Sequence, residues 1–210
     1  MTADQMLTEL AQRLEDANAS EFSDTMKVDA LNNAQNRMVD LLHGEYLTEL
    51  EVREGFSHSA NSPKMVFGVL DFNTLSNTVL HGAKGIKAIK VLNGKYMNKL
   101  DVSDVKEFDS AMVDTDLSDP YYIALGDKAE LVPSTSQVHI PIDVYYIKTP
   151  TKMAVGGTCE LNEGLHYLLI ILAESYCWSN SEEFTRSQDA ERIALEQIKI
   201  MNSNVAVQGE

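Results

Sequence analysis

The side chains best suited to chemistry in this sequence are five histidines and two cysteines. Glu163 and His166 stand three positions apart, which is the spacing of half a di-iron site on a helix. Bundle enzymes with such sites repeat this pair on a second helix and add further carboxylates. Here the pair occurs once. We therefore expect His166 to be a partly exposed helix residue and not a metal ligand.

The two cysteines give no stronger indication of a catalytic site. Cys159 follows Gly156-Gly157 and could be a nucleophile below a turn, but the sequence pairs no histidine with it. The chain starts without the basic and apolar segments of a secretory signal, so Cys159 and Cys177 are expected to be reduced. The sequence contains no glycine-rich phosphate loop and no serine nucleophile motif. It predicts no catalytic residue, no metal site and no cofactor.

A basic patch is the clearest charged feature. Five lysines occur where no acidic residue is found from Thr74 to Leu100; they are Lys84, Lys87, Lys90, Lys95 and Lys99. Lysines often protect the edge of a β-sheet from pairing with other chains, and this is the first explanation. A charged contact with acidic helices of a neighbouring copy is the second, and contact with phosphate is the third. We call these residues the lysine patch.

Composition places the chain among folded acidic proteins. It has 210 residues, 44% of them hydrophobic, and a formal net charge of -15. The acids are concentrated at the two ends: residues 1–51 hold eleven acidic against three basic residues, and residues 159–210 hold nine against three. Such a chain is a poor candidate for tight DNA binding, although it suits a wall along which DNA slides. Its longest apolar run is far shorter than the roughly 20 residues that a membrane span needs.

Hydrophobic periodicity predicts an α+β fold in which N- and C-terminal helices form an antiparallel bundle around a β-rich insertion. The bundle halves are residues 1–51 and 158–210, and the insertion is residues 52–157. Helical spacing with caps is found at 2–18 and at 23–43, where Thr2 caps the first helix and Ser23 or Asp24 caps the second. Alternation indicates strands at 46–52, 65–70, 86–92, 120–126, 129–133 and 137–148, and a short helix is expected at 101–110. Asn93-Gly94 predicts a hairpin turn, and Pro141 suggests an edge strand or a bulge.

The C-terminal helices carry two predictions about contacts. The helix after Leu165 is apolar on both sides, because Tyr167, Ile170, Ile171 and Trp178 oppose its leucine face. We expect this second face to be covered partly by the first two helices and partly by a neighbouring copy. The next helix is expected to end near Asn202. Val205, Ala206 and Val207 would then form an extended tail that adds to a sheet edge of another chain, or packs on its own bundle.

Short signatures along most of the chain resemble the head-to-tail adaptor proteins of tailed bacteriophages. The signatures are Phe22-Ser-Asp24, Leu31-Asn-Asn-Ala-Gln35, Asp119-Pro-Tyr-Tyr122, the stretch from Val138 to Pro150, and Leu161-Asn-Glu-Gly-Leu-His166. The resemblance implies a structural virion protein without enzymatic activity. It implies a homo-oligomeric ring, usually of twelve copies, below the portal vertex and assembled in the host cytoplasm. Such a ring binds the portal protein and tail or nozzle proteins, and packaged DNA passes through its channel. The resemblance also implies that the portal is the chain on which the tail at Val205, Ala206 and Val207 docks.

Two other classes of function remain open from the sequence. One is a different virion component, such as a tail-completion protein. A ring of the purified protein with the portal would distinguish an adaptor from such a component. The other is a small soluble enzyme or ligand-binding domain, which would need a cleft with convergent functional groups.

Overall fold

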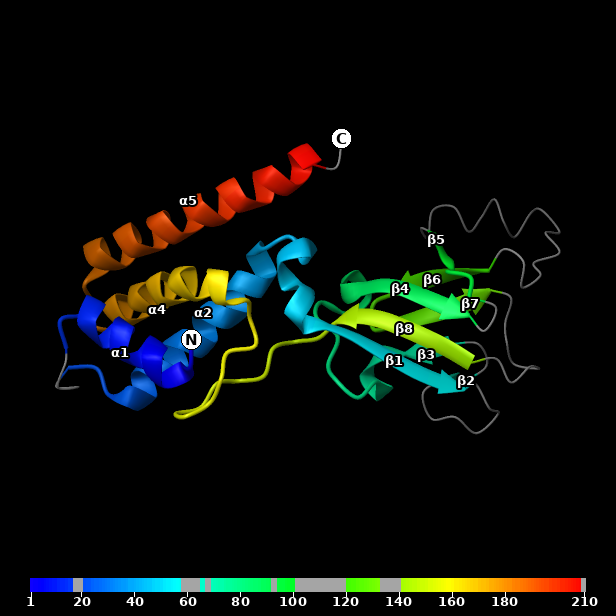
Figure 1. Ribbon diagram of the computed structural model, residues 1–210, viewed down its shortest axis with the longest axis horizontal. Helices are drawn as coiled ribbons and strands as arrows, with labels where there is room; N and C mark the ends of the chain where they lie inside the picture. Colours follow the sequence, from blue (N-terminus) through cyan, green and yellow to red (C-terminus); the bar gives the residue numbers. More distant parts are fainter. Residues whose placement is uncertain are drawn as a thin grey trace. The chain divides into compact units, whose positions relative to one another are not determined.

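The computed structural model describes residues 1–16, 21–57, 65–66, 69–91, 94–100, 120–132 and 141–208. The fold is α+β, as predicted, with helices at both ends of the chain and a β-rich middle (Figure 1). The chain divides into a helical unit, Met1–Leu50 with Pro150–Glu210, and a sheet unit, Glu51–Thr149. These boundaries lie one residue and eight residues before the positions expected from the sequence. The helix expected at 101–110 lies outside the described residues.

The first two helices begin at the predicted caps. Helix α1, Ala3–Arg13, has a capping box in which the Thr2 hydroxyl accepts from the Gln5 amide and the Gln5 side chain accepts from the Thr2 amide. Helix α2, Asp24–Leu41, is capped by the Ser23 hydroxyl. These bonds satisfy amide groups that a helix start leaves without partners.

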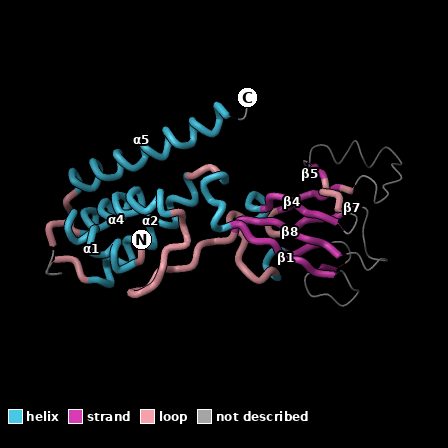
Figure 2. Tube along the Cα trace, in the orientation of Figure 1, coloured by secondary structure: helices cyan, strands magenta, loops and turns pink. Residues whose placement is uncertain are grey.

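Helix α4, His166–Asn180, is the centre of the helical unit. The one-turn 3-10 helix η5, Glu163–Leu165, leads into it, and helix α5, Phe184–Gln208, follows it. Helices α1, α2 and α5 all pack against α4, and Figure 2 shows α5 running beside it. A helix that is apolar on every side needs such cover. Within the described residues, no helix is both long and apolar enough to cross a membrane.

Buried amides on α2 hold the segment that enters the helical unit from the sheet unit. The Asn32 side chain donates to the Met153 carbonyl (3.1 Å) and accepts from the Met153 amide (2.7 Å). Gln35 donates to the Thr151 carbonyl (3.0 Å). Both side chains are buried. They provide hydrogen-bond partners for backbone groups that would otherwise need a neighbouring strand or water.

An aromatic contact fixes the start of α2 to α4, and a buried ion pair joins α2 to the segment after α1. Phe22 meets Trp178 edge to face, with ring centres 5.5 Å apart. The Asp16 carboxylate accepts from the Phe22 amide (2.8 Å) and lies 3.7 Å from the Lys27 ammonium. Asp16 and Lys27 are both buried, so each compensates the charge of the other.

The sheet unit contains two sheets. The three-stranded sheet has the order β1–β8–β4, and the five-stranded sheet has the order β2–β3–β7–β6–β5. The first consists of β1 (Glu51–Ser57), β8 (Pro141–Ile147) and β4 (Ile86–Val91); the second of β2 (Met65–Val66), β3 (Val69–Asp71), β7 (Lys128–Val132), β6 (Tyr121–Leu125) and β5 (Asn98–Leu100). Described strand pairs are antiparallel except β5 with β6. Side chains of both sheets form one apolar core, and η2 (Phe72–Thr74) and η3 (Gly82–Gly85) are short helices in the connections.

The hairpin turn expected at Asn93-Gly94 is confirmed in its described part. Gly94 has φ +75°, a left-handed conformation that glycine adopts without strain, and its amide donates to the Val91 carbonyl. The edge position expected for Pro141 is wrong, because β8 is the central strand. Pro141 is the first residue of β8, a place where a missing amide is tolerated. The strand expected from Tyr46 starts only at Glu51, and Gly44–Leu50 is the 3-10 helix η1.

The extended C-terminal tail is also a wrong prediction. Helix α5 continues through Val205, Ala206 and Val207 to Gln208. Asn202 was expected to end this helix, but its side chain accepts from the His43 amide (2.9 Å) and donates to the Leu41 carbonyl (2.7 Å). Because that side chain binds another helix, it does not compete for the backbone of its own helix.

Candidate functional site

The Glu163–His166 pair binds the amino terminus of the chain. The Met1 ammonium lies 2.8 Å from Glu163 Oε1 and 3.0 Å from His166 Nδ1, and His166 Nε2 lies 2.8 Å from the Leu161 carbonyl. His166 is buried, so the expectation that it is partly exposed is wrong. Burial, with a further contribution from the ammonium, lowers the pKa of His166. A neutral imidazole that accepts at Nδ1 and donates at Nε2 fits both contacts.

The cysteines are free thiols. Cys159 Sγ lies 3.5 Å from Gln35 Oε1, and burial raises its pKa above the ordinary value. Burial raises the pKa of Cys177 to about 12. Since the thiolate is the reactive form, both side chains are poor nucleophiles near neutral pH. Among the residues that the structure describes, no three His, Cys, Asp or Glu side chains form a group that could hold a metal ion.

Three of the four side chains predicted for a subunit interface lie inside the helical unit. Ile170 and Ile171 are fully buried and Trp178 is 5% exposed, so a neighbouring copy has no access to them. The sequence showed that both sides of α4 are apolar, but α1, α2 and α5 of the same chain cover them. Only Tyr167 is exposed, at 55%, and the Arg13 guanidinium lies 5.7 Å from its ring centre.

Exposed apolar side chains lie instead on α5. This helix buries Ala190, Ala194 and Ile198, which recur every four residues and form a narrow stripe. Ile193 and Ile200 are 41% and 53% exposed and stand two turns apart, so they share another face of the helix. Helical spacing alone groups Ile193 with Ala190 and Ala194 and predicts that it points inward, and the structure shows that this prediction is wrong. Phe184, at the start of α5, is 60% exposed.

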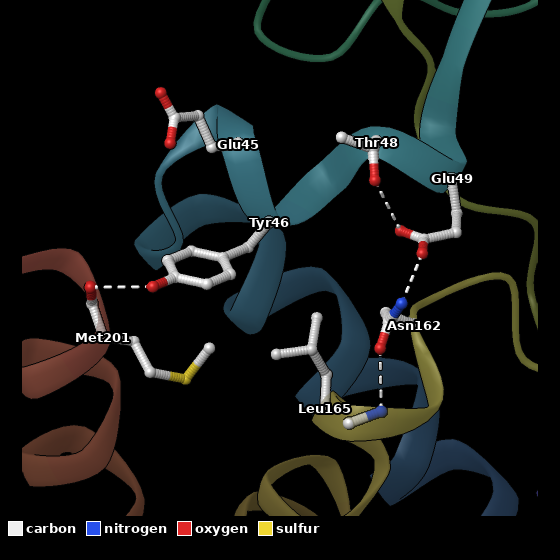
Figure 3. A pocket seen from close by; sticks show the side chains of 8 residues that line it. Glu45, Tyr46, Thr48, Glu49, Asn162, Leu165 and Met201 are labelled. Carbon is white, nitrogen blue, oxygen red and sulfur yellow. Dashed lines mark hydrogen bonds between the residues drawn. The ribbon is translucent and has the colours of Figure 1, made fainter. Parts of the chain in front are cut away.

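A pocket of about 310 Å³ lies in the helical unit between η1, η5 and α5. Leu165, Tyr46 and Met201 form its apolar wall, and the Tyr46 hydroxyl donates to the Met201 carbonyl (3.0 Å) (Figure 3). Glu49 stands at the opposite side and accepts from the Asn162 amide group (2.5 Å). This hydrogen bond lowers the pKa of Glu49, so its carboxylate is charged at neutral pH.

The carboxylate of Glu45 marks the outer rim of the same pocket and points away from the Tyr46 ring (Figure 3). The pocket therefore combines an apolar wall with two acidic side chains at its mouth. Such a lining suits an amphipathic cation, for example a lysine or arginine side chain with its apolar stem.

The lysine patch is spread over η3 (Lys84), β4 (Lys87 and Lys90), the segment after β4 (Lys95) and β5 of the other sheet (Lys99). Lys84, Lys87, Lys95 and Lys99 are exposed and Lys90 is half-buried. Strand β4 is the last strand of its sheet, but its outer side is not an open edge, because the Met97 amide donates to the Ile89 carbonyl and the Val91 amide to the Lys95 carbonyl. Lys87 forms an ion pair with Glu51 of β1.

Next to the lysine patch are three side chains that sequence reasoning missed. Arg53 on β1 donates to Asp143 Oδ2 of β8 (2.7 Å), and its guanidinium lies 5.9 Å from the ring centre of Tyr145. Tyr96 is 58% exposed, and its ring centre lies 6.2 Å from that of Tyr145. Alternation along β8 indicates that Tyr145 points away from the core, but only strand pairing brings Arg53 and Tyr96 to it.

No protein-family model matches this sequence, and a search of curated proteins finds no significant match.

Proposed function

We propose that the chain is a structural virion protein, a head-to-tail adaptor of a tailed bacteriophage. In this proposal, copies form a ring, of twelve by the resemblance, below the portal. The ring extends the channel for packaged DNA and binds tail or nozzle proteins. Chemical turnover is not part of the proposed role.

The observation that carries the proposal is the surface of α5. This helix contributes two alanines and one isoleucine to the core, while Phe184, Ile193 and Ile200 are 41–60% exposed. Apolar side chains presented repeatedly along a long exposed helix are typical of surfaces that contact other subunits. In a closed ring, every copy offers the same surface to a neighbour.

The signatures that carry the resemblance support the same proposal. Phe22, Asn32 and Gln35 fix α2 to α4 and to the segment near Thr151, and Glu163 and His166 hold the amino terminus. These residues come from distant parts of the sequence and stabilise one helical unit. A stable frame of this kind is what a repeated ring subunit needs.

Charge gives a further supporting argument. Residues 1–50 and 150–210, which form the helical unit, contain nineteen acidic and seven basic residues. A strongly acidic surface repels the phosphates of DNA, so a channel with such a wall lets DNA move without being held.

The test is assembly of the purified chain with and without purified portal protein, followed by mass photometry and negative-stain electron microscopy. We expect rings with portal. A variant with Ile193→Glu and Ile200→Glu should not form rings, whereas Asn33→Asp, an exposed change on α2, should. Circular dichroism must show the same helix content for all three proteins. A wild-type chain that stays monomeric and leaves the portal unbound overturns the proposal.

A further inference from the structure

The outward face of the three-stranded sheet carries an organised set of charged and aromatic side chains. Along β8, Ile142, Val144 and Tyr146 point into the core, so Asp143 and Tyr145 are on the opposite face. Strand pairing places Arg53 and Ala88 on either side of Tyr145, and Gly55 and Lys90 on either side of Asp143. Tyr96 continues the second row through its bridge to Lys90.

These side chains hold one another in place. Asp143 binds the Arg53 guanidinium, which lies against the Tyr145 ring; Tyr145 is near Tyr96, and the Lys90 ammonium lies 5.7 Å from the Tyr96 ring centre. Gly55 leaves room for this arrangement, because a Cβ atom there would lie 2.8 Å from Asp143 Oδ1. We call Arg53, Lys90, Tyr96 and Tyr145 the cation–tyrosine face.

The face has the composition of a recognition surface. Arginine and tyrosine dominate binding energy at many protein interfaces, because they offer large contact areas with polar ends. The Arg53 side chain is 62% exposed and Tyr96 is 58% exposed, so both are accessible in the single chain. Two exposed lysines, Lys87 on β4 and Lys95 beside Tyr96 in the sequence, belong to the same hairpin.

The distribution of charge along the chain indicates which partner the cation–tyrosine face binds. No acidic residue occurs between Thr74 and Leu100, whereas the helical unit has nineteen acidic against seven basic residues. The pocket beside η1 adds a matching shape, since Glu45 and Glu49 stand at its mouth and Leu165 lies within it. An apolar stem with a cationic end fits this pocket.

We propose that the cation–tyrosine face of one copy binds the helical unit of a second copy at the pocket rimmed by Glu45 and Glu49. The inference deepens the proposed function, on which it rests, by naming the chemistry of the contact between neighbouring copies. Because the contact joins two different surfaces, a pair of copies still has one unoccupied cation–tyrosine face and one unoccupied pocket. Each of these can bind a further copy. Contacts of this type extend from copy to copy and close when the rotation allows.

The experiment is self-association of the purified full-length chain, measured by sedimentation velocity over a concentration series at two salt concentrations. We expect association to weaken as salt rises, because exposed charges are screened. A variant with Arg53→Glu and Lys90→Glu should associate about a hundredfold more weakly, since like charges then meet at the contact. Lys128→Glu, an exposed lysine on the other sheet, is the matched control and should behave like the wild type.

A charge-swap arm separates a direct contact from a general effect of charge. A second variant with Glu45→Lys and Glu49→Lys should also fail to self-associate. Mixed with the Arg53→Glu and Lys90→Glu variant, it should form mixed oligomers, because each supplies the charge that the other has lost. Absence of mixed oligomers, with both proteins folded by circular dichroism, overturns the inference.

Two further outcomes also count against it. In the first, the Arg53→Glu and Lys90→Glu variant forms rings as readily as the wild type. This result contradicts the inferred contact but is compatible with the proposed function. The other is binding of labelled single-stranded or duplex DNA that this variant loses while its self-association stays unchanged. In that case the face recognises phosphate and not a second copy. A wild-type chain that does not self-associate at any concentration tested also overturns the inference, whereas self-association without portal binding counts only against the proposed function.

Discussion

The helical unit and the sheet unit use their polar side chains in opposite ways. In the helical unit, Asn32, Gln35 and His166 are buried, and their hydrogen bonds go to backbone groups or to the amino terminus. In the sheet unit, Arg53 and Tyr96 lie on the surface and contact neighbouring side chains. A polar residue that is fully used by its own chain has a structural role. One that is fixed in place yet exposed is available to a partner.

Among the variants that test this contrast, we expect the largest change in the free energy of unfolding from Trp178→Ala. Trp178 packs edge to face on Phe22, and the Arg186 guanidinium lies 4.7 Å from its ring centre. Loss of a buried aromatic side chain typically lowers the free energy of unfolding by about 3–5 kcal/mol. Urea unfolding followed by circular dichroism measures the change. Tyr167→Ala, at an exposed position on the same helix, should cost far less, and equal losses for the two variants would contradict the assignment.

The second test compares neighbouring asparagines. Asn32 is buried and forms two hydrogen bonds with the Met153 backbone, whereas Asn33 is exposed. Asn32→Ala leaves a buried amide and a buried carbonyl without partners, which costs about 1–3 kcal/mol for each such group. Asn33→Ala should change the free energy of unfolding by less than about 0.5 kcal/mol. If both variants melted at the wild-type temperature, the role given to Asn32 would be wrong.

The smallest effect concerns pH. The pKa of His166 is lowered in the folded chain, so the unfolded chain binds a proton at higher pH than the folded chain does. Stability is therefore complete above the unfolded pKa of about 6.5 and falls as pH drops toward the lowered value. Urea unfolding between pH 5 and 8 should show this decline in the wild type.

Replacing His166 with Gln should flatten that decline, because glutamine keeps a donor and an acceptor without titrating. The control is Asn33→Gln, an exposed change that adds no titrating group, which should keep the wild-type pH dependence. A profile unchanged by His166→Gln would show that another group is responsible.

Local signals in the sequence predicted much of the fold. Thr2 with Gln5, Ser23, and Gly94 act through atoms a few residues away, so their roles follow from spacing alone. The α+β class followed from the change of hydrophobic period. The Gly44–Leu50 helix was missed because its hydrophobic residues alternate roughly as those of a strand do, and a short 3-10 turn has no strong pattern of its own.

The candidate sites were harder to predict because they depend on distant contacts. Apolar residues on both sides of α4 show that the helix is covered, but the sequence does not say by which chain. Asn202 has the usual character of a helix stop, and only the nearby end of α2 explains why α5 continues. Arg53, Tyr145 and Tyr96 come together through the register of neighbouring strands. Period-2 alternation shows which face of its own strand a residue is on, but it does not show which residue of the next strand lies beside it.

The narrow buried stripe of α5 has a consequence for the motion of the helical unit. Alanine buries little apolar area, so Ala190 and Ala194 add little to the free energy that holds α5 on α4. Much of the remaining attachment is polar and is found along its length: Ser187 with Ser175, Glu191 with Arg37, and Asn202 with the end of α2. We expect a helix held in this way to open before the rest of its unit unfolds, and hydrogen exchange should then be faster for its amides than for those of α4. If α5 opens in this way, we expect that it can close on the α4 of another copy with the same bonds, which is domain swapping.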